Sequence, residues 1–147
     1  MAAGTALISG VTGVVGARIA SHLASIGGWR VIGLSRRIPA VSDRVAGVDY
    51  LSLDATDDAA CAKVLGDLSG VTHFFNAARY DHTTTQREPA DVNTRMFLNV
   101  LDQLEQRGRP LRHVHLVQGT KYYGSTEGRF PTPARESDPR SLYDTFY

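Results

Sequence analysis

The sequence predicts an α/β protein with a doubly wound parallel sheet, and two observations support this fold class. Five apolar runs of strand length alternate with three segments of helical periodicity along the 147 residues. A glycine-rich turn joins the first apolar run to the first helical segment. Such alternation requires crossover connections between parallel strands, which place helices on both faces of the sheet. We expect the strand order 3-2-1-4-5, with a ligand beyond the carboxyl ends of the strands.

The expected strands and helices follow from the period of the apolar residues. In the first helical segment Val15, Ile19 and Leu23 share one face, and the Gly27-Gly28 pair ends the helix. Acidic residues open the second helix, and the third carries apolar residues every three or four positions. A polar stretch near the end is too rich in glycine, proline and charge to belong to the core. We expect strands at residues 6–9, 29–34, 50–53, 71–76 and 113–118, helices at residues 15–26, 57–68 and 89–106, and the polar loop at residues 124–140.

Composition and charge indicate one globular domain without a nucleic-acid or membrane partner. Apolar residues make up 42% of the chain, charged residues 21%, and the net charge is +1. The single cysteine, Cys61, lies in a helical pattern and is expected to be a buried, reduced thiol. His73, His113 and His115 lie in strand patterns without metal-ligand spacing, so we expect no metal site. Neither a membrane-spanning run nor a secretion signal is recognisable, which makes a cytoplasmic location the expectation.

The glycine-rich turn predicts a dinucleotide site. Gly10, Gly13 and Gly16 stand in the spacing Gly-x-x-Gly-x-x-Gly between a strand and a helix. Glycines in such a turn permit a tight bend, a close approach of the backbone to pyrophosphate and close packing of helix on strand. The alternative is a tight strand-to-helix turn without a ligand. The residues of the turn expected to contact the cofactor are Gly10, Thr12, Gly13, Val14, Val15 and Gly16.

The end of the second strand indicates which nicotinamide cofactor is preferred. An acidic residue at this place binds the ribose 2′-hydroxyl of NAD, whereas arginine accommodates the 2′-phosphate of NADP. The chain has Ser35, Arg36 and Arg37 there and no carboxylate. One hydroxyl and two guanidinium groups can surround a doubly charged phosphate, so we expect NADPH. The alternative is that the two arginines are ordinary surface charges.

The Thr-Gly-x-x-Gly form of the turn, at residues 12–16, resembles the extended short-chain dehydrogenase/reductase superfamily. Asp54 resembles the acidic residue with which that superfamily contacts adenine, while the nearby Asp57 fits a helix cap. The Asn-Ala-Ala sequence at residues 76–78 resembles the turn that passes beneath the cofactor ribose. The resemblance implies a Rossmann-type NADP-binding domain, with further cofactor contacts from Asp54, Ala55, Asn76, Ala77, Ala78 and Gln118.

A second motif narrows the resemblance to one branch of the superfamily. Most members carry Tyr-x-x-x-Lys, but no tyrosine of this chain has a lysine four positions later. Instead, Gly-Thr-Lys-Tyr-Tyr-Gly at residues 119–124 places Lys121 just after the fifth strand. This motif, the closing Phe-Tyr pair and several segments between residues 29 and 102 resemble the progesterone 5β-reductase/iridoid synthase-like enone reductases. In that family the corresponding lysine and tyrosine are catalytic, which implies catalytic roles for Lys121 and Tyr147. Tyr122 and Thr145 depart from the family, where histidine and asparagine are usual.

The resemblance implies an NADPH-dependent oxidoreductase that reduces the C=C bond of a small-molecule enone. A homodimer is a further expectation. Two alternatives remain open: a conventional extended-type sugar-nucleotide epimerase or reductase, and a non-catalytic NADPH-binding sensor. Residues 1–147 are expected to form an incomplete Rossmann domain that lacks the C-terminal strand or strands and the substrate-binding region. Such a piece is expected to be inactive by itself and prone to association through its uncovered surfaces.

Overall fold

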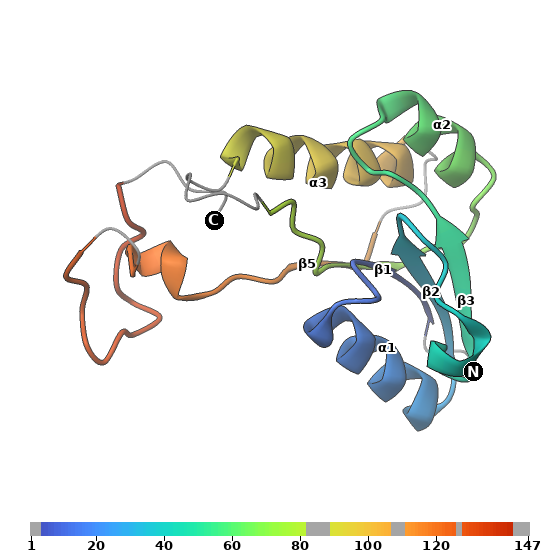
Figure 1. Cartoon of the computed structure of the whole chain (residues 1–147), viewed down its shortest axis with the longest axis horizontal. Coiled ribbons are helices and arrows are strands. Elements are labelled where there is room, and N and C mark those ends of the chain that lie inside the picture. Colours follow the sequence, from blue (N-terminus) through green and yellow to red (C-terminus); the bar gives the residue numbers. More distant parts are fainter. Residues whose placement is uncertain (1–3, 82–88, 107–110, 126–127, 143–147) are drawn as a thin grey trace.

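The sheet has five parallel strands in the order β3-β2-β1-β4-β5, as expected (Figure 1). The computed structural model describes residues 4–81, 89–106, 111–125 and 128–142. Strand order reverses beside β1, which pairs with β2 on one side and with β4 on the other. A crevice for a ligand is expected at this position in an open α/β sheet. The strands are β1 (Gly4–Ser9), β2 (Trp29–Ser35), β3 (Val48–Ser52), β4 (His73–Asn76) and β5 (His113–Leu116).

The helices lie on opposite faces of the sheet, which confirms the doubly wound arrangement. Figure 1 shows α1 (Val14–Ile26) below the sheet, and α2 (Asp58–Gly66) and α3 (Ala90–Glu105) above it. Two short 3₁₀ helices, η1 (Val41–Asp43) and η2 (Thr120–Tyr123), were not expected from the sequence. Such short helices have no long apolar period by which a sequence could reveal them.

Two apolar layers hold these elements together, because the alternating side chains of the buried strands face different helices. Ala6 and Ile8 of β1 pack with Ala20 and Leu23 of α1. Leu7, between them in the sequence, belongs to the opposite layer. That layer also contains Ile32, Leu34, Leu53, Cys61, Leu65, Val71, Phe74, Val100 and Leu104.

The element boundaries differ from the expected ones by a few residues. The third strand begins at Val48, two positions before the expected start, because it pairs with Val31 of β2. The fourth begins at His73, two positions after the expected start. The preceding Thr72 donates its backbone N–H to Thr5 O, 2.9 Å away, in the connection that leads into the strand. The fifth ends at Leu116, two residues early. The described part of the polar loop after η2 contains neither helix nor strand, as expected.

Strand β5 forms one edge of the sheet and is largely exposed. His113, Val114 and His115 are all exposed, in contrast to the buried central strands. The rings of His113 and His115 stack with their centroids 6.0 Å apart, and His73 of β4 lies 6.1 Å from His113. Within the described ranges, no three histidine, cysteine, aspartate or glutamate side chains are grouped as metal ligands. None of the described helices is both long and apolar enough to span a membrane.

Candidate functional site

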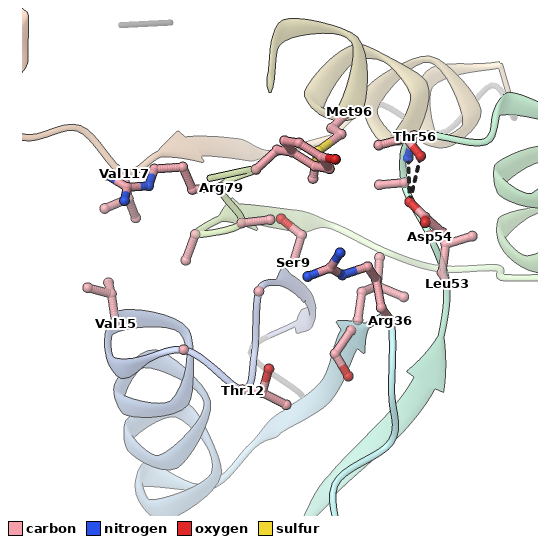
Figure 2. A pocket seen from close by; sticks show the side chains of 18 of the residues that line it. Ser9, Thr12, Val15, Arg36, Leu53, Asp54, Thr56, Arg79, Met96 and Val117 are labelled. Carbon is pink, nitrogen blue, oxygen red and sulfur yellow. Dashed lines mark hydrogen bonds between the residues drawn. The ribbon is translucent and has the colours of Figure 1, made fainter. Parts of the chain in front are cut away.

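A cleft of about 610 Å³ opens at the carboxyl ends of the strands, where strand order reverses (Figure 2). One side lies over the ends of β2 and β3 and is called the β2–β3 side. The other lies over the end of β4 and the residues after β5 and is called the β4–β5 side. The cleft is lined by Ser9, Gly10, Thr12, Gly13, Val14, Val15, Leu34, Ser35, Arg36, Leu53, Asp54, Ala55, Thr56, Ala77, Ala78, Arg79, Tyr80, Met96 and Val117.

The glycine turn forms the floor of the cleft between its two sides. Gly10 has a φ of 72°, and a Cβ atom there would lie 2.7 Å from the backbone carbon and oxygen of Ala77. A Cβ on Gly16 would collide with Gly10 O and lie 2.8 Å from Gly10 C. Glycine is therefore required at both positions. At Gly10 it lets the backbone approach the turn after β4, and at Gly16 it lets helix α1 approach the glycine turn.

The first turn of α1 is suited to an anion. Its N-cap is Gly13, no side chain caps it, and it carries no acidic residue. Val14 is 85% exposed, so the helix end is open to a ligand. The N-terminal backbone N–H groups and the helix dipole both favour a negatively charged group such as pyrophosphate.

On the β2–β3 side, two serine hydroxyls fix the backbone at the tip of β2. Ser35 Oγ donates to Arg37 O at 2.7 Å, and Ser52 Oγ of β3 donates to Arg36 O at 3.0 Å. Figure 2 shows the Arg36 guanidinium extending into the cleft from this tip. Arg37 does not line the cleft. The structure therefore separates the two arginines that the sequence treats as a pair.

Asp54 is held as an ionised carboxylate on the same side. Its Oδ1 accepts hydrogen bonds from Thr56 Oγ1 at 2.7 Å and from Thr56 N at 3.0 Å (Figure 2). These bonds lower the pKa of the Asp54 carboxyl, and the charge of Arg36 lowers it further. Asp57 accepts from Ala60 N at 3.0 Å, which confirms the expected helix cap on α2.

Close by, Cys61 lies on the buried face of α2, as expected. Burial, together with the nearby carboxylates of Asp58, Asp57 and Asp54, raises the pKa of its thiol to about 11. The thiol therefore stays protonated at neutral pH and is a poor nucleophile.

On the β4–β5 side, a buried hydrogen bond lies beneath the cleft. Ser9 Oγ donates to Asn76 Oδ1, and the two residues are 3% and 4% exposed. Asn76 itself does not line the cleft, whereas Ala77 and Ala78 after it do. Arg79 follows and forms a 2.5 Å ion pair with Asp81.

An adjoining pocket of about 290 Å³ extends the cleft beyond the β4–β5 side. It shares Arg79 and Val117 with the cleft and is also lined by Gln118 and Gly119. Lys121 stands two residues further on, partly buried in η2, and lines neither space. Tyr147 lies outside the described residues.

Most of the residues singled out in the sequence lie together at this cleft. Gly16, Arg37, Asn76 and Lys121 are the described exceptions. Sequence reasoning missed Ser9, Leu34 and Leu53, which end expected strands and could have been found by that rule. It also missed Thr56, in the loop after the third strand, and Val117, near the end of the fifth expected strand. It also missed Arg79, Tyr80 and Met96. The residues that the sequence did predict and that line the cleft or the adjoining pocket are Gly10, Thr12, Gly13, Val14, Val15, Ser35, Arg36, Asp54, Ala55, Ala77, Ala78 and Gln118.

A parallel sheet in this order, with a glycine turn and a cleft at the reversal point, defines a Rossmann-type fold. The chain belongs to the NAD dependent epimerase/dehydratase family, whose model matches residues 6–145. This family forms the extended group of short-chain dehydrogenases/reductases, in agreement with the resemblance of the glycine turn.

Curated relatives agree with the narrower resemblance. The chain is 34% identical to an (S)-8-oxocitronellyl enol synthase of Antirrhinum majus, over 97% of this chain and 38% of the relative. It is 33% identical to a 3-oxo-Delta(4,5)-steroid 5-beta-reductase of Arabidopsis thaliana, over 97% of this chain and 39% of the relative. The chain thus spans less than half the length of these relatives.

Solved structures share the fold at lower sequence identity. The Bordetella bronchiseptica enzyme WbmH, in complex with NAD+, aligns with a TM-score of 0.72 and 18% identity, over 98% of this chain and 47% of that one. WbmG of the same organism, in complex with NAD and UDP, aligns with a TM-score of 0.71 and 19% identity, over 96% of this chain and 44% of that one.

Proposed function

We propose that the protein binds NADPH in this cleft and reduces the C=C bond of an activated enone. The observation that carries the proposal is the position of Lys121. It follows Gln118 and Gly119, which line the pocket beyond the β4–β5 side, in a motif that resembles the enone reductases. The relatives named as enol synthase and steroid 5-beta-reductase support the same chemistry.

The charges of the cleft favour one orientation of the cofactor. Arg36 suits a 2′-phosphate, so in this proposal the adenosine half lies over the β2–β3 side, with Asp54 near the adenine. The uncapped end of α1 receives the pyrophosphate. The nicotinamide half then lies over the β4–β5 side, where Ala77 and Ala78 leave room for it. When bound, NADPH supplies the hydride.

In this proposal Lys121 and Tyr147 act on the carbonyl oxygen of the enone, as the resemblance to the enone reductases implies. Addition of hydride at the β-carbon would move an electron pair onto this oxygen, and the resulting enolate would take a proton from water at the α-carbon. The Tyr147 hydroxyl donates a hydrogen bond to the oxygen and stabilises its developing charge. The Lys121 ammonium adds a favourable electrostatic field for this negative charge.

The experiment measures reduction of small and steroidal enones by the purified full-length protein, with NADPH and with NADH. Lys121→Ala and Tyr147→Phe are each expected to lower kcat by about 10² to 10³-fold. Their dissociation constants for NADPH should stay within about twofold of wild type, because neither group holds the cofactor in this proposal. Lys63→Ala, at an exposed position of α2, is the control for loss of a surface lysine. Full activity in both site variants would refute the assignment.

A further inference from the structure

Two asparagine side chains of α3 each hold one of the loops that form the cleft. Asn93 contacts the loop after β4, and Asn99 contacts the loop after β3. The two residues are six positions apart, and Met96 lies midway between them. Since residues three apart are neighbours on a helix surface, the three side chains form one oblique row. Met96 lines the cleft directly (Figure 2).

Asn93 is the more deeply buried of the two, at 1% exposed. Its Oδ1 accepts from Tyr80 N at 2.7 Å, and its Nδ2 donates to Tyr80 O and to Pro89 O, each at 3.1 Å. One amide group therefore fixes both backbone polar groups of Tyr80. Tyr80 and the preceding Arg79 line the cleft on its β4–β5 side.

Asn99 makes a corresponding contact on the other side. Its Nδ2 donates to Ala55 O at 2.9 Å, across 44 positions of sequence. Ala55 lies between Asp54 and Thr56, and all three line the cleft on its β2–β3 side. The Asp54 carboxylate is oriented by Thr56, so the loop that Asn99 holds carries the charged group of that side.

We propose that Asn93 and Asn99 are positioning residues, each of which sets the geometry of one end of the cofactor. Asn93 positions the β4–β5 side and therefore the nicotinamide half. Asn99 positions the β2–β3 side and therefore the adenosine half. The inference rests on the proposed NADPH binding. It adds that the two ends of the cofactor are controlled separately, by different residues of the same helix.

A purely structural role would have a different consequence. Loss of either side chain would then lower the stability of the whole domain and weaken every ligand alike. A positioning role changes one end of the cleft and spares the other. The test therefore needs one measurement that reports the adenosine half and a second that reports the nicotinamide half.

The variants are Asn93→Leu and Asn99→Leu in the full-length protein, with Thr94→Ala as the control at an exposed position of the same helix. The first measurement is the dissociation constant of adenosine 2′,5′-bisphosphate, which contains only the adenosine half with its 2′-phosphate. The second is the fluorescence emission of the dihydronicotinamide in saturating NADPH.

Asn99→Leu is expected to weaken adenosine 2′,5′-bisphosphate about tenfold and to leave the emission of bound NADPH as in wild type. Asn93→Leu is expected to do the reverse: a shifted emission and an affinity for adenosine 2′,5′-bisphosphate within about twofold of wild type. Asn93→Asp serves where the leucine variant does not fold. It keeps the acceptor for Tyr80 N and loses the donor to Tyr80 O and Pro89 O.

Equal changes in both measurements for both variants, or no change in either, would overturn the positioning role while leaving the proposed function intact. Failure of the wild-type protein to bind NADPH and adenosine 2′,5′-bisphosphate would overturn the proposed function and this inference together. The two failures are thus distinguishable from the wild-type measurement alone.

Discussion

The two sides of the cleft are built by contacts of different range. On the β2–β3 side, the polar side chains that line the cleft are held by local bonds, Ser35 with Arg37 and Asp54 with Thr56, while Asn99 adds one bond across 44 positions. On the β4–β5 side, Ser9 and Asn76 are 67 positions apart, and Asn93 reaches 13 positions back to Tyr80. The sheet edge there is also exposed along β5. A short sequence motif can therefore describe the polar side chains of the first side, whereas those of the second depend on the folded sheet, and α3 supports the loops of both sides.

The largest effect on the cleft is expected from a substitution at Gly10, because this residue lies between the two sides. Gly10→Ala adds a Cβ at a φ of 72° and places it 2.7 Å from the backbone of Ala77. We expect a loss of about 3 to 5 kcal/mol in the free energy of unfolding, together with loss of NADPH binding. Denaturant unfolding and a cofactor titration measure the two effects.

Gly27→Ala is the matched control, since Gly27 has the same φ of 72° but no atom within 4 Å of an added Cβ. It is expected to cost only the backbone strain, about 1 to 3 kcal/mol, and to leave NADPH binding intact. Equal costs at the two positions would show that the close approach to Ala77 is unimportant.

The same difference in range explains what the sequence could predict. The fold class, the strand order and the glycine turn follow from local periodicity and spacing. Ser35 and Arg36 follow from their place at the end of the second strand, and Asp54 follows from the resemblance to the superfamily. Arg79 and Met96 could not be found in this way. The apolar period that contains Met96 fits a residue of the core as well as a residue of the cleft. Only the packing of α3 across the strand ends brings Met96 to the cleft.

The arginines at the tip of β2 allow a sharper test of the β2–β3 side. Arg36 lines the cleft and Arg37 does not. Arg36 should therefore contribute strongly to NADPH affinity, and Arg37 only weakly. Arg36→Ala is expected to weaken NADPH about 10 to 100-fold and to change NADH little, because only NADPH carries the 2′-phosphate.

Arg37→Ala should have a clearly smaller effect on NADPH in the same titration. Arg30→Ala removes a guanidinium from the amino-terminal part of β2, where it pairs with Asp49 at 3.5 Å, and is the control for net charge. If Arg36→Ala weakened NADPH and NADH alike, the 2′-phosphate contact would be wrong.

The smallest expected effect concerns His73, the first residue of β4, which lies at the other end of this strand from the cleft. Burial lowers the pKa of its imidazole, and the charges of His113 and Arg112 lower it further. The ring packs edge-on against Trp29 with centroids 4.7 Å apart. Since the unfolded chain binds the proton more readily, His73 reduces stability as pH falls through the ordinary histidine pKa toward the lower folded value.

His73→Phe keeps an aromatic ring beside Trp29 and removes the titrating group. The free energy of unfolding should therefore fall less between pH 7.5 and pH 5.5 in this variant than in wild type, by well under about 1 kcal/mol. His22→Phe, on the exposed surface of α1, controls for the general effect of replacing one histidine. A steeper fall in His73→Phe than in wild type would reverse the sign of the argument. In that case the long-range contacts around β4 and β5 would favour the charged imidazole, and this side of the sheet would be more polar than its packing indicates.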